Sequence, residues 1–435
     1  MLNDNDLGRL FVDLAVIVLV AHATGLLLKR FGQPAVLGEI LGGIALGPTL
    51  LGAFPGDPSR MLFPAAVRPS LSAIGNVGLV LFMFLVGLEV DVGAVRRHDR
   101  TLAAVSFCAV ALPFGLGIGV AALLYPSHEL VAGHKVGFVP FAMFIATALS
   151  ITAFPVLARI LVDHRLQGTR LGELALTSAG VQDGVGWLLL AASLVALSGG
   201  GPAHLARIVA EAVVFGAVLL LVVRPLLARL LARSDGSGSV RLDPVTLAIG
   251  GLALSAAATQ LIGLHVVIGA FAFALAFPRS EPAAVARRLE TTFRPATMLL
   301  FLPVYFLTPG LNVNLRALDT QAIWQLCLVL TAACAGKLIG AAVPARLRGL
   351  SWREAGSLGA LLNARGLIEL VVLTIGLNRH VLDHRLFTVM VCMAVLTTLA
   401  TGPLLTFLSR QRESAGKPTA TGALVSELGL DGEPR

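Results

Sequence analysis

Charged residues are scarce in this chain of 435 residues. Asp, Glu, Lys and Arg make up 13% of the positions, whereas hydrophobic residues make up 56% and the mean hydropathy is +0.85. A soluble domain typically carries about 25% charged residues, so this chain cannot cover a surface that faces water on all sides. The scarcity excludes an ordinary soluble protein and predicts an integral membrane protein.

Cysteines and strand-like patterns are also few. Strict apolar–polar alternation is absent, which argues against an outer-membrane barrel. The net charge of +8 does not indicate nucleic-acid binding, because the basic residues lie in short loops between apolar runs. An enzyme is disfavoured and no cofactor is expected, since no nucleophile–base pair or metal cluster is visible. The cysteines all fall inside apolar runs, where they predict small packing residues rather than disulfides or a metal site: Cys108, Cys327, Cys334 and Cys392.

Apolar runs of roughly 20 residues, by contrast, fill the chain, and this is the length that crosses a ~30 Å hydrocarbon core as a helix. We therefore predict an all-α polytopic membrane protein with about thirteen transmembrane helices in one domain over residues 1–409. A short tail, 410–435, is expected to be cytoplasmic and disordered. The predicted spans lie near 10–28, 34–52, 70–90, 101–125, 138–161, 173–198, 203–230, 243–262, 265–278, 293–311, 321–346, 353–377 and 385–409.

The basic residues predict the orientation of these spans. An odd number of spans places the two termini on opposite sides, and most of the 33 Lys and Arg residues fall in the tail or in loops on the same side as the tail. Loops rich in Lys and Arg remain in the cytoplasm. The expected topology is a multi-pass protein of the inner (cytoplasmic) membrane with its N-terminus outside and its C-terminus inside.

Two pairs of segments suggest an internal repeat. VLGEILGGIALGP in span two resembles VIGAFAFALAFP in span nine, and FLVGLEVD in span three resembles FLTPGLNVN in span ten. Each pair is seven spans apart, and because seven is odd the two copies must face opposite ways. We expect spans 1–6 and 8–13 to be inverted repeats joined by span 7, a plan in which secondary transporters place their site at the midplane.

Asp183 is the clearest candidate for function, because a carboxylate deep in a membrane is costly unless it is paired or hydrated. It lies about ten residues into span six, in VQDGVGW, beside Gln182 and among glycines that let a backbone, water or ion approach. We interpret Asp183 as the group that binds a monovalent cation or a proton. The alternative is a structural carboxylate bonded to a neighbouring helix.

The span before Asp183 contains the hydroxyl residues Thr147, Ser150 and Thr152, followed by Pro155. Proline lacks a backbone donor and clashes with the carbonyl four residues earlier, here that of Ile151. The pattern predicts a break near 150–152 whose freed carbonyls coordinate a cation beside Asp183. The alternative is a kinked helix whose hydroxyls bond their own backbone.

Span twelve is the counterpart of this span in the second repeat. Arg365 and Glu369 are four residues apart and can pair along one helix face, while Gly366 suggests a second interruption next to Asn363. If both broken spans cross, Arg365 and Glu369 would offset the dipoles of the half-helix ends. Direct ligation of the ion is the alternative role for this pair.

Two other ionisable residues lie within spans. Lys337 is expected to have a carboxylate partner; Asp183 is the first candidate, and Glu39 and Glu369 remain open. Glu39 lies mid-span among glycines and is interpreted as functional.

Together these motifs resemble the Kef-like branch of monovalent cation:proton antiporters, which includes the plant cation/H+ exchangers and the sodium/hydrogen exchanger domain. They occur in family order from about residue 10 to 409. The matching stretches are VLGEILGGIALGP, LFMFLVGLEVD, TALSITAFPVLARIL, VQDGVGW, LHVVIGAFAFALAFP, CAGKLIG and LLNARGLIELVVLTIG.

The resemblance implies a homodimer in which a mobile core with crossed, broken helices moves against a dimerisation domain. It implies that Asp183 carries the ion or the proton, that Thr147, Ser150 and Thr152 lie on the unwound stretch, and that Lys337 pairs with the carboxylate. Electrogenic relatives have two adjacent aspartates; Gln182 replaces the first here, which implies electroneutral exchange.

One departure limits what can be transferred. Kef channels carry a nucleotide-binding domain after the last span, whereas no dinucleotide fingerprint lies in 410–435, so regulation by nucleotide is not expected. The predicted substrates are H+ with K+ or Na+. A sodium-coupled organic-anion symporter of similar fold and a gated cation channel are the alternative functions.

Overall fold

A computed structural model describes residues 4–89, 100–163, 166, 169–197, 201–233, 243–278 and 283–415. Within these ranges the chain is almost entirely helical, and its only strands are the short antiparallel pair β1 (Leu130–Val131) and β2 (His134–Lys135). The α-helices are α1 (Asp4–Arg30), α2 (Ala35–Leu46), α3 (Pro58–Leu62), α4 (Arg68–Glu89), α5 (Arg100–His128), α6 (Phe138–Ser150), α7 (Phe154–Asp163), α8 (Arg170–Leu197), α9 (Gly201–Val218), α10 (Arg224–Arg233), α11 (Pro244–Ile262), α12 (Val266–Ala276), α13 (Ala283–Ala296), α14 (Leu302–Gly310), α15 (Thr320–Leu347), α16 (Trp352–Leu362), α17 (Leu367–Asn378) and α18 (His384–Ala415).

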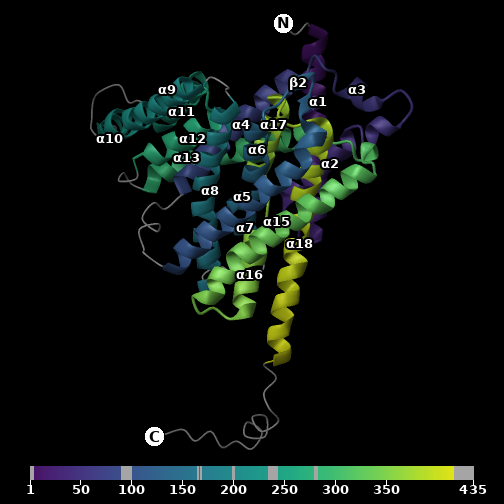
Figure 1. The fold of residues 1–435 in the computed structure, drawn as a ribbon. Coiled ribbons are helices and arrows are strands. Elements are labelled where there is room, and N and C mark those ends of the chain that lie inside the picture. The colour runs from purple at the N-terminus through teal and green to yellow at the C-terminus, as the bar shows by residue number, and fades with distance from the viewer. Residues whose placement is uncertain are drawn as a thin grey trace, which may run out of the picture.

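All thirteen predicted spans have a counterpart among these helices. Ten helical segments of the described residues are long and apolar enough to cross a membrane, and three shorter apolar helices, within α6, α12 and α17, account for the others. Two spans are continuous through π-helical turns, at 219–223 between α9 and α10 and at 297–301 between α13 and α14. The chain begins at one end of the molecule with α1, and α18 ends at the opposite end (Figure 1). The predicted tail lies largely in 416–435, outside the described residues.

The first broken span is formed by α6 and α7. Helix α6 ends at Ser150, Ile151 is extended with φ −74° and ψ 142°, and α7 begins at Phe154. Pro155 is then the second residue of α7, a position where its missing N–H costs nothing. The predicted break at 150–152 is therefore confirmed, and proline ends one half-helix while it starts the next.

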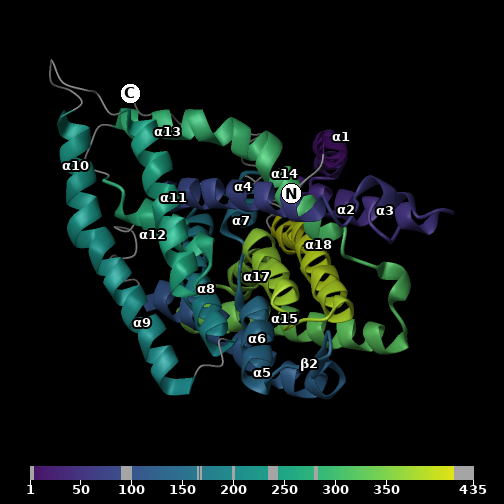
Figure 2. The ribbon, with the colours of Figure 1, turned by 90° about the horizontal axis from the view of Figure 1, so that it is seen from above.

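The second broken span is formed by α16 and α17. Helix α16 begins with a capping box between Ser351 and Glu354, ends at Leu362, and is separated from α17 by the four residues 363–366. The interruption predicted at Gly366 is confirmed. Seen from above, α17 lies in the interior of the helix bundle, while α9 and α10 run along one edge (Figure 2).

Helices seven spans apart pack in corresponding ways. The contact between α1 and α2 corresponds to the contact between α11 and α12. The contact between α2 and α14 corresponds to the contact between α12 and α4. Likewise α5 packs on α6 as α15 packs on α16, while α5 and α15 pack on each other. The last contact is close because Gly336 and Gly340 face α5: an added Cβ would lie 2.8 Å from Pro113 and 2.6 Å from the Cys108 carbonyl. These contacts hold the two broken spans beside one another.

Candidate ion-binding site

The two breaks cross and hydrogen-bond directly to each other. The Ala153 amide in the first break donates to the Ala364 carbonyl in the second over 3.0 Å. The Thr152 hydroxyl lies 2.9 Å from the Leu362 carbonyl at the end of α16. Half-helix ends leave such groups without partners inside their own helices, so the crossing satisfies them while holding both breaks at one depth.

Asp183 on α8 faces the first break and is 4% exposed. The backbone amide of Phe154, the first residue of α7, donates to its carboxylate, so the positive end of a half-helix points at the acid. Its Oδ1 atom has no hydrogen-bond partner within the described part of the chain. Gly186 brings α8 close to the break, because a Cβ there would lie 3.1 Å from the Ile151 side chain. One carboxylate oxygen is thus available to a proton, a cation or water.

Lys337 on α15 is fully buried and binds uncharged oxygens. Its Nζ donates to the Ser150 carbonyl, to the Thr152 hydroxyl over 2.7 Å and to Gln182 Oε1 over 2.8 Å. An ammonium has three N–H donors, so all three are used. Among the ion pairs of the described residues none joins Lys337 to a carboxylate, and its hydrogen bonds go to the first break and to Gln182. Its charge still interacts with those of Glu369 and Asp183, so the pairing with Asp183 stays a prediction.

The predicted hydroxyl residues divide between two places. Thr152 lies with Gln182 and Lys337, as expected. Thr147 instead bonds the Ser193 hydroxyl on α8 over 3.1 Å, and the Ser150 hydroxyl donates to the Ala146 carbonyl of its own helix over 2.6 Å. The expectation that all three hydroxyls line the site is therefore corrected. Serine in a helix readily bonds the carbonyl four residues back, and Ser150 contributes its carbonyl to the site rather than its hydroxyl.

Arg365 lies at the C-terminal end of the half-helix α6, and Glu369 lies at the N-terminal end of the half-helix α17. The Arg365 guanidinium donates to the Ala148 and Leu149 carbonyls, over 2.7 and 2.8 Å, in the last turn of α6. Glu369 lies in the first turn of α17, 3.5 Å from Arg365, and both side chains are fully buried. A cation at a helix C-terminus and an anion at a helix N-terminus both offset the end dipoles. Neither side chain has a hydrogen bond to Asp183 among the described contacts.

Asn363 and Glu39 differ in their distance from this cluster. Asn363 ends α16 and donates to the Cys334 sulfur, one turn before Lys337, over 3.7 Å. Glu39 is partly exposed on α2, which packs on α1 and α14, and its nearest charge interaction is with Lys29. No described hydrogen bond or ion pair joins Glu39 to Asp183 or Lys337, and its charge-compensating role stays a prediction.

Sequence reasoning missed the residue that holds the second break in place. Thr398 on α18 accepts a hydrogen bond from the Arg365 amide over 2.9 Å, and its hydroxyl lies 2.6 Å from the Arg365 carbonyl. It is fully buried. A cluster of threonines in the last span, at 397, 398 and 401, was the available signal.

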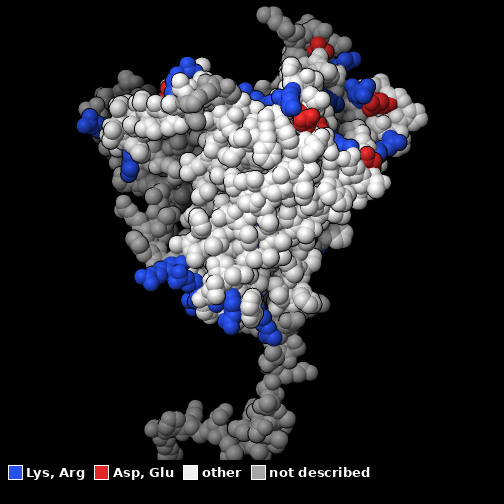
Figure 3. All heavy atoms as spheres, in the orientation of Figure 1, with Lys and Arg blue, Asp and Glu red and all other residues white. Residues whose placement is uncertain are grey.

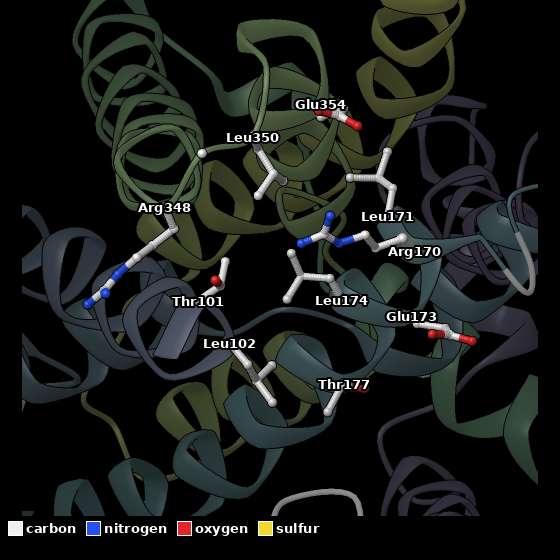
Figure 4. A pocket seen from close by; sticks show the side chains of 11 residues that line it. Thr101, Leu102, Arg170, Leu171, Glu173, Leu174, Thr177, Arg348, Leu350 and Glu354 are labelled. Atoms are coloured by element: carbon white, nitrogen blue, oxygen red, sulfur yellow. The ribbon is translucent and has the colours of Figure 1, made fainter. Parts of the chain in front are cut away.

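A cavity of about 400 Å³ opens where the starts of α5 and α8 meet the turn between α15 and α16 (Figure 4). Figure 4 shows the Arg170 guanidinium directed into it. Thr177 also lines it and lies six residues before Asp183, roughly 9 Å along α8. The cavity thus borders the part of α8 that lies about two helical turns before Asp183. Its lining residues are Thr101, Leu102, Arg170, Leu171, Glu173, Leu174, Thr177, Arg348, Gly349, Leu350 and Glu354.

Comparison with known proteins decides the family. Residues 15–411 match the sodium/hydrogen exchanger transmembrane family. The chain belongs to the sodium/hydrogen exchanger family. This match confirms the family membership that the sequence motifs predicted for the chain.

Several curated relatives are named as antiporters. The exchanger is 38% identical to Cation/H(+) antiporter 20 of Arabidopsis thaliana over 91% of this chain and 48% of that protein. It is 36% identical to the Na(+)/H(+) antiporter NhaS4 of Synechocystis sp. over 93% of this chain and 98% of that protein. The K(+)/H(+) antiporter 1 of Saccharomyces cerevisiae is 32% identical over 94% and 47% of the two chains. The exchanger spans about half the length of the plant and yeast relatives.

A solved structure shows the same fold. The sodium proton antiporter MjNhaP1 from Methanocaldococcus jannaschii superposes with a TM-score of 0.64, covering 93% of the exchanger and 99% of that chain at 14% identity. The predicted antiporter-like fold is therefore confirmed.

Proposed function

We propose that the exchanger is a secondary active transporter that exchanges a monovalent cation, K+ or Na+, for H+ by alternating access, with Asp183 carrying either ion. The observation that carries this proposal is the buried Asp183 carboxylate at the crossing of two broken helices, with one oxygen that has no hydrogen-bond partner among the described residues. Relatives named as Na(+)/H(+) and K(+)/H(+) antiporters support the choice of substrates.

The geometry supports competition between a proton and a cation at Asp183. The Phe154 amide and the positive end of α7 stabilise the ionised carboxylate, which then attracts a cation. The Lys337 ammonium occupies three oxygens that a dehydrated monovalent cation would use, those of Ser150, Thr152 and Gln182. Lys337 therefore competes with the cation for these three oxygens and hydrogen-bonds to them when no cation is bound.

The remaining architecture follows from the same proposal. The matching packing of α1–α2 with α11–α12 supports two inverted repeats, spans 1–6 and 8–13, joined by span 7 within 1–409. The cavity beside Thr177 is the route from the cytoplasm toward Asp183. The exchanger works as a homodimer in the inner membrane, with its N-terminus outside. A broad uncharged band separates Lys and Arg side chains at one edge from mixed charges near α3, as a bilayer requires (Figure 3).

Cation-dependent proton flux in proteoliposomes tests the function. An outward gradient of Na+ or K+ should drive protons inward in the wild type, and Asp183→Asn should abolish this flux because asparagine can neither hold a proton nor neutralise a cation. Asp13→Asn is the matched control, since Asp13 is equally buried but lies on α1. Proton flux that persists in well-folded Asp183→Asn would refute the proposal. Cation uptake coupled to an organic anion, or conductance without proton movement, would favour the symporter or the channel.

A further inference from the structure

A second buried polar cluster lies at the far end of α5 from the cytoplasmic cavity. His128, the last residue of α5, is 2% exposed, and its Nδ1 lies 2.6 Å from the Asp383 carboxylate. Its Nε2 lies 2.9 Å from the side-chain nitrogen of Gln325 on α15. Asp383 also accepts a hydrogen bond from the Leu386 amide over 2.7 Å and so caps α18. The cluster therefore ties together the ends of three helices, α5, α15 and α18.

The hydrogen bonds of the imidazole fit a neutral ring. With Nδ1–H donating to Asp383, a Gln325 side-chain nitrogen that faces Nε2 requires Nε2 to be the acceptor. Gln325 Oε1 is buried without a described partner. A protonated ring would carry a donor on Nε2, which requires Oε1 rather than the nitrogen to face it. Rotation of one amide thus accommodates the proton, and the cluster has two arrangements.

Asp383 remains ionised through this change. Burial raises the pKa of Asp383, but the hydrogen bonds from His128 and from the Leu386 amide, with the charge of a protonated His128 and the Arg385 amide, outweigh burial and hold the pKa below its ordinary value. Its carboxylate contribution to stability is therefore present above the unfolded pKa of about 3.9 and is lost only in stronger acid. The side chain is 29% exposed, which gives protons access from the water on this side.

Other charges around His128 are already bound to one another. On the side of α15 and α18, Arg385 pairs with Asp319. On the side of the strands, Lys135 pairs with Glu129 over 3.2 Å. Gln321 on α15 donates to Ser127 over 3.1 Å. His134 on β2 and His384 at the start of α18 are the further titratable groups nearby, and His134 is exposed.

The cluster is connected to the ion-binding site through α18. Asp383 fixes the start of that helix, and Thr398, roughly 22 Å along it, holds both backbone groups of Arg365 in the second break. A displacement at Asp383 is therefore transmitted by a rigid helix to the crossing of the breaks.

We propose that His128, Asp383 and Gln325 form a proton-operated clamp on the outer end of the exchanger, which positions α18 and the second break so that outer pH sets the exchange rate. His128 is a positioning residue here, and the inference rests on the proposed function and orientation. At acidic outer pH the His128 ring gains a proton, and its hydrogen bond to the ionised Asp383 carboxylate becomes an ion pair between two opposite charges. The clamp then holds α18 more tightly and slows exchange.

Oriented proteoliposomes test the clamp, with His128→Gln as the variant that keeps a donor and an acceptor but cannot titrate. At constant inner pH, the rate of His128→Gln relative to wild type should rise at least about threefold as the outer pH falls from about 7.5 to 5.5. Varying inner pH over the same range should leave this ratio unchanged. The exchange rate of Asp383→Asn relative to wild type should show the same dependence on outer pH as that of His128→Gln. The double variant should show no larger effect than either single variant. His134→Gln, on the same face but exposed, should follow the wild type at every pH.

A ratio that stays constant, or one that responds to inner pH, overturns the clamp. Thermal unfolding of detergent-solubilised protein separates this failure from failure of the proposed function. In the Asp183→Asn background, His128→Gln should lower the unfolding temperature more at pH of about 5.5 than at about 7.5. At the lower pH the substitution removes an ion pair, whereas at the higher pH it removes only the hydrogen bond of an uncharged ring. This pH dependence without any cation–proton exchange would support the clamp and refute the proposed function; its absence would overturn the clamp.

Discussion

At the scale of single residues, the central cluster places a buried ammonium among oxygens that carry no formal charge. Lys337 is fully buried, and its hydrogen bonds go to a carbonyl, a hydroxyl and an amide. A buried charge is tolerated only when its donors are satisfied. The oxygens of the first break and of Gln182 therefore stabilise the buried ammonium of Lys337, and Lys337 in turn satisfies those buried oxygens.

Removing this ammonium should make stability depend on the cation. Lys337→Ala leaves the Ser150 carbonyl, the Thr152 hydroxyl and Gln182 Oε1 without their shared donor, at a cost of about 1–3 kcal/mol for each group that stays unsatisfied. Added Na+ or K+ can take the same oxygens and should restore part of the loss. The measurement is the unfolding temperature against cation concentration, with a bulky organic cation as control. A variant no more cation-dependent than the wild type would show that these oxygens do not bind the cation.

At the scale of elements, the two breaks are held by different devices. The first is determined locally, by Pro155 within α7. The second depends on α18, because the Thr398 hydroxyl contacts both the amide and the carbonyl of Arg365. Arg365 in turn covers the carbonyls that end α6, so the position of α18 bears on both half-helices.

Thr398→Val tests this dependence with little change of shape. The substitution leaves a buried amide and carbonyl unpaired and should destabilise the protein by about 1–3 kcal/mol while slowing exchange. Thr397→Val is the matched control, because Thr397 is buried on the same helix and its hydroxyl bonds only carbonyls of α18 among the described residues. Urea or thermal unfolding of both variants gives the comparison. Equal losses would mean that Thr398 contributes only to its own helix.

At the scale of the whole molecule, the charge carried by the cluster determines how exchange responds to voltage. Under the proposed function, with Gln182 in place of a second acid, Asp183 holds either one proton or one cation. If Lys337 keeps its proton throughout, the two loaded forms carry equal charge. If Lys337 releases its proton when the cation binds, the forms before and after binding again carry equal charge. Either route makes the exchange one-for-one and electroneutral.

Proteoliposomes under an imposed potassium/valinomycin potential test this charge balance, with Na+ as the transported cation. The rate and the end point of exchange in the wild type should not change with voltage. Gln182→Glu, which adds a second carboxylate beside the first, is the variant in which a voltage effect should emerge. A wild-type rate that moves with voltage would require a second titrating group, and Glu369, which has a buried oxygen without a hydrogen-bond partner in the described part of the chain, is the first residue to substitute.

Much of the fold was predictable because the responsible signals are local. Apolar runs defined the thirteen spans, and Pro155 and Gly366 marked the breaks, since chain length, hydropathy and proline geometry act within a few residues. The same local motifs identified the family and singled out Asp183 as a buried carboxylate.

The sequence by itself thus determined a thirteen-span member of the sodium/hydrogen exchanger family with two interrupted helices and an acid in span six. Only the tertiary structure decided which atoms meet there. Lys337 donates hydrogen bonds to the Ser150 carbonyl and to Gln182, and not to the Ser150 hydroxyl or to Asp183. Thr398 accepts a hydrogen bond from the Arg365 amide. These contacts join residues far apart along the chain, 187 positions in the case of Ser150 and Lys337. Hydropathy shows that a helix is buried, but the rotation of each helix against its neighbours, which selects the partners, is set by packing across the whole bundle.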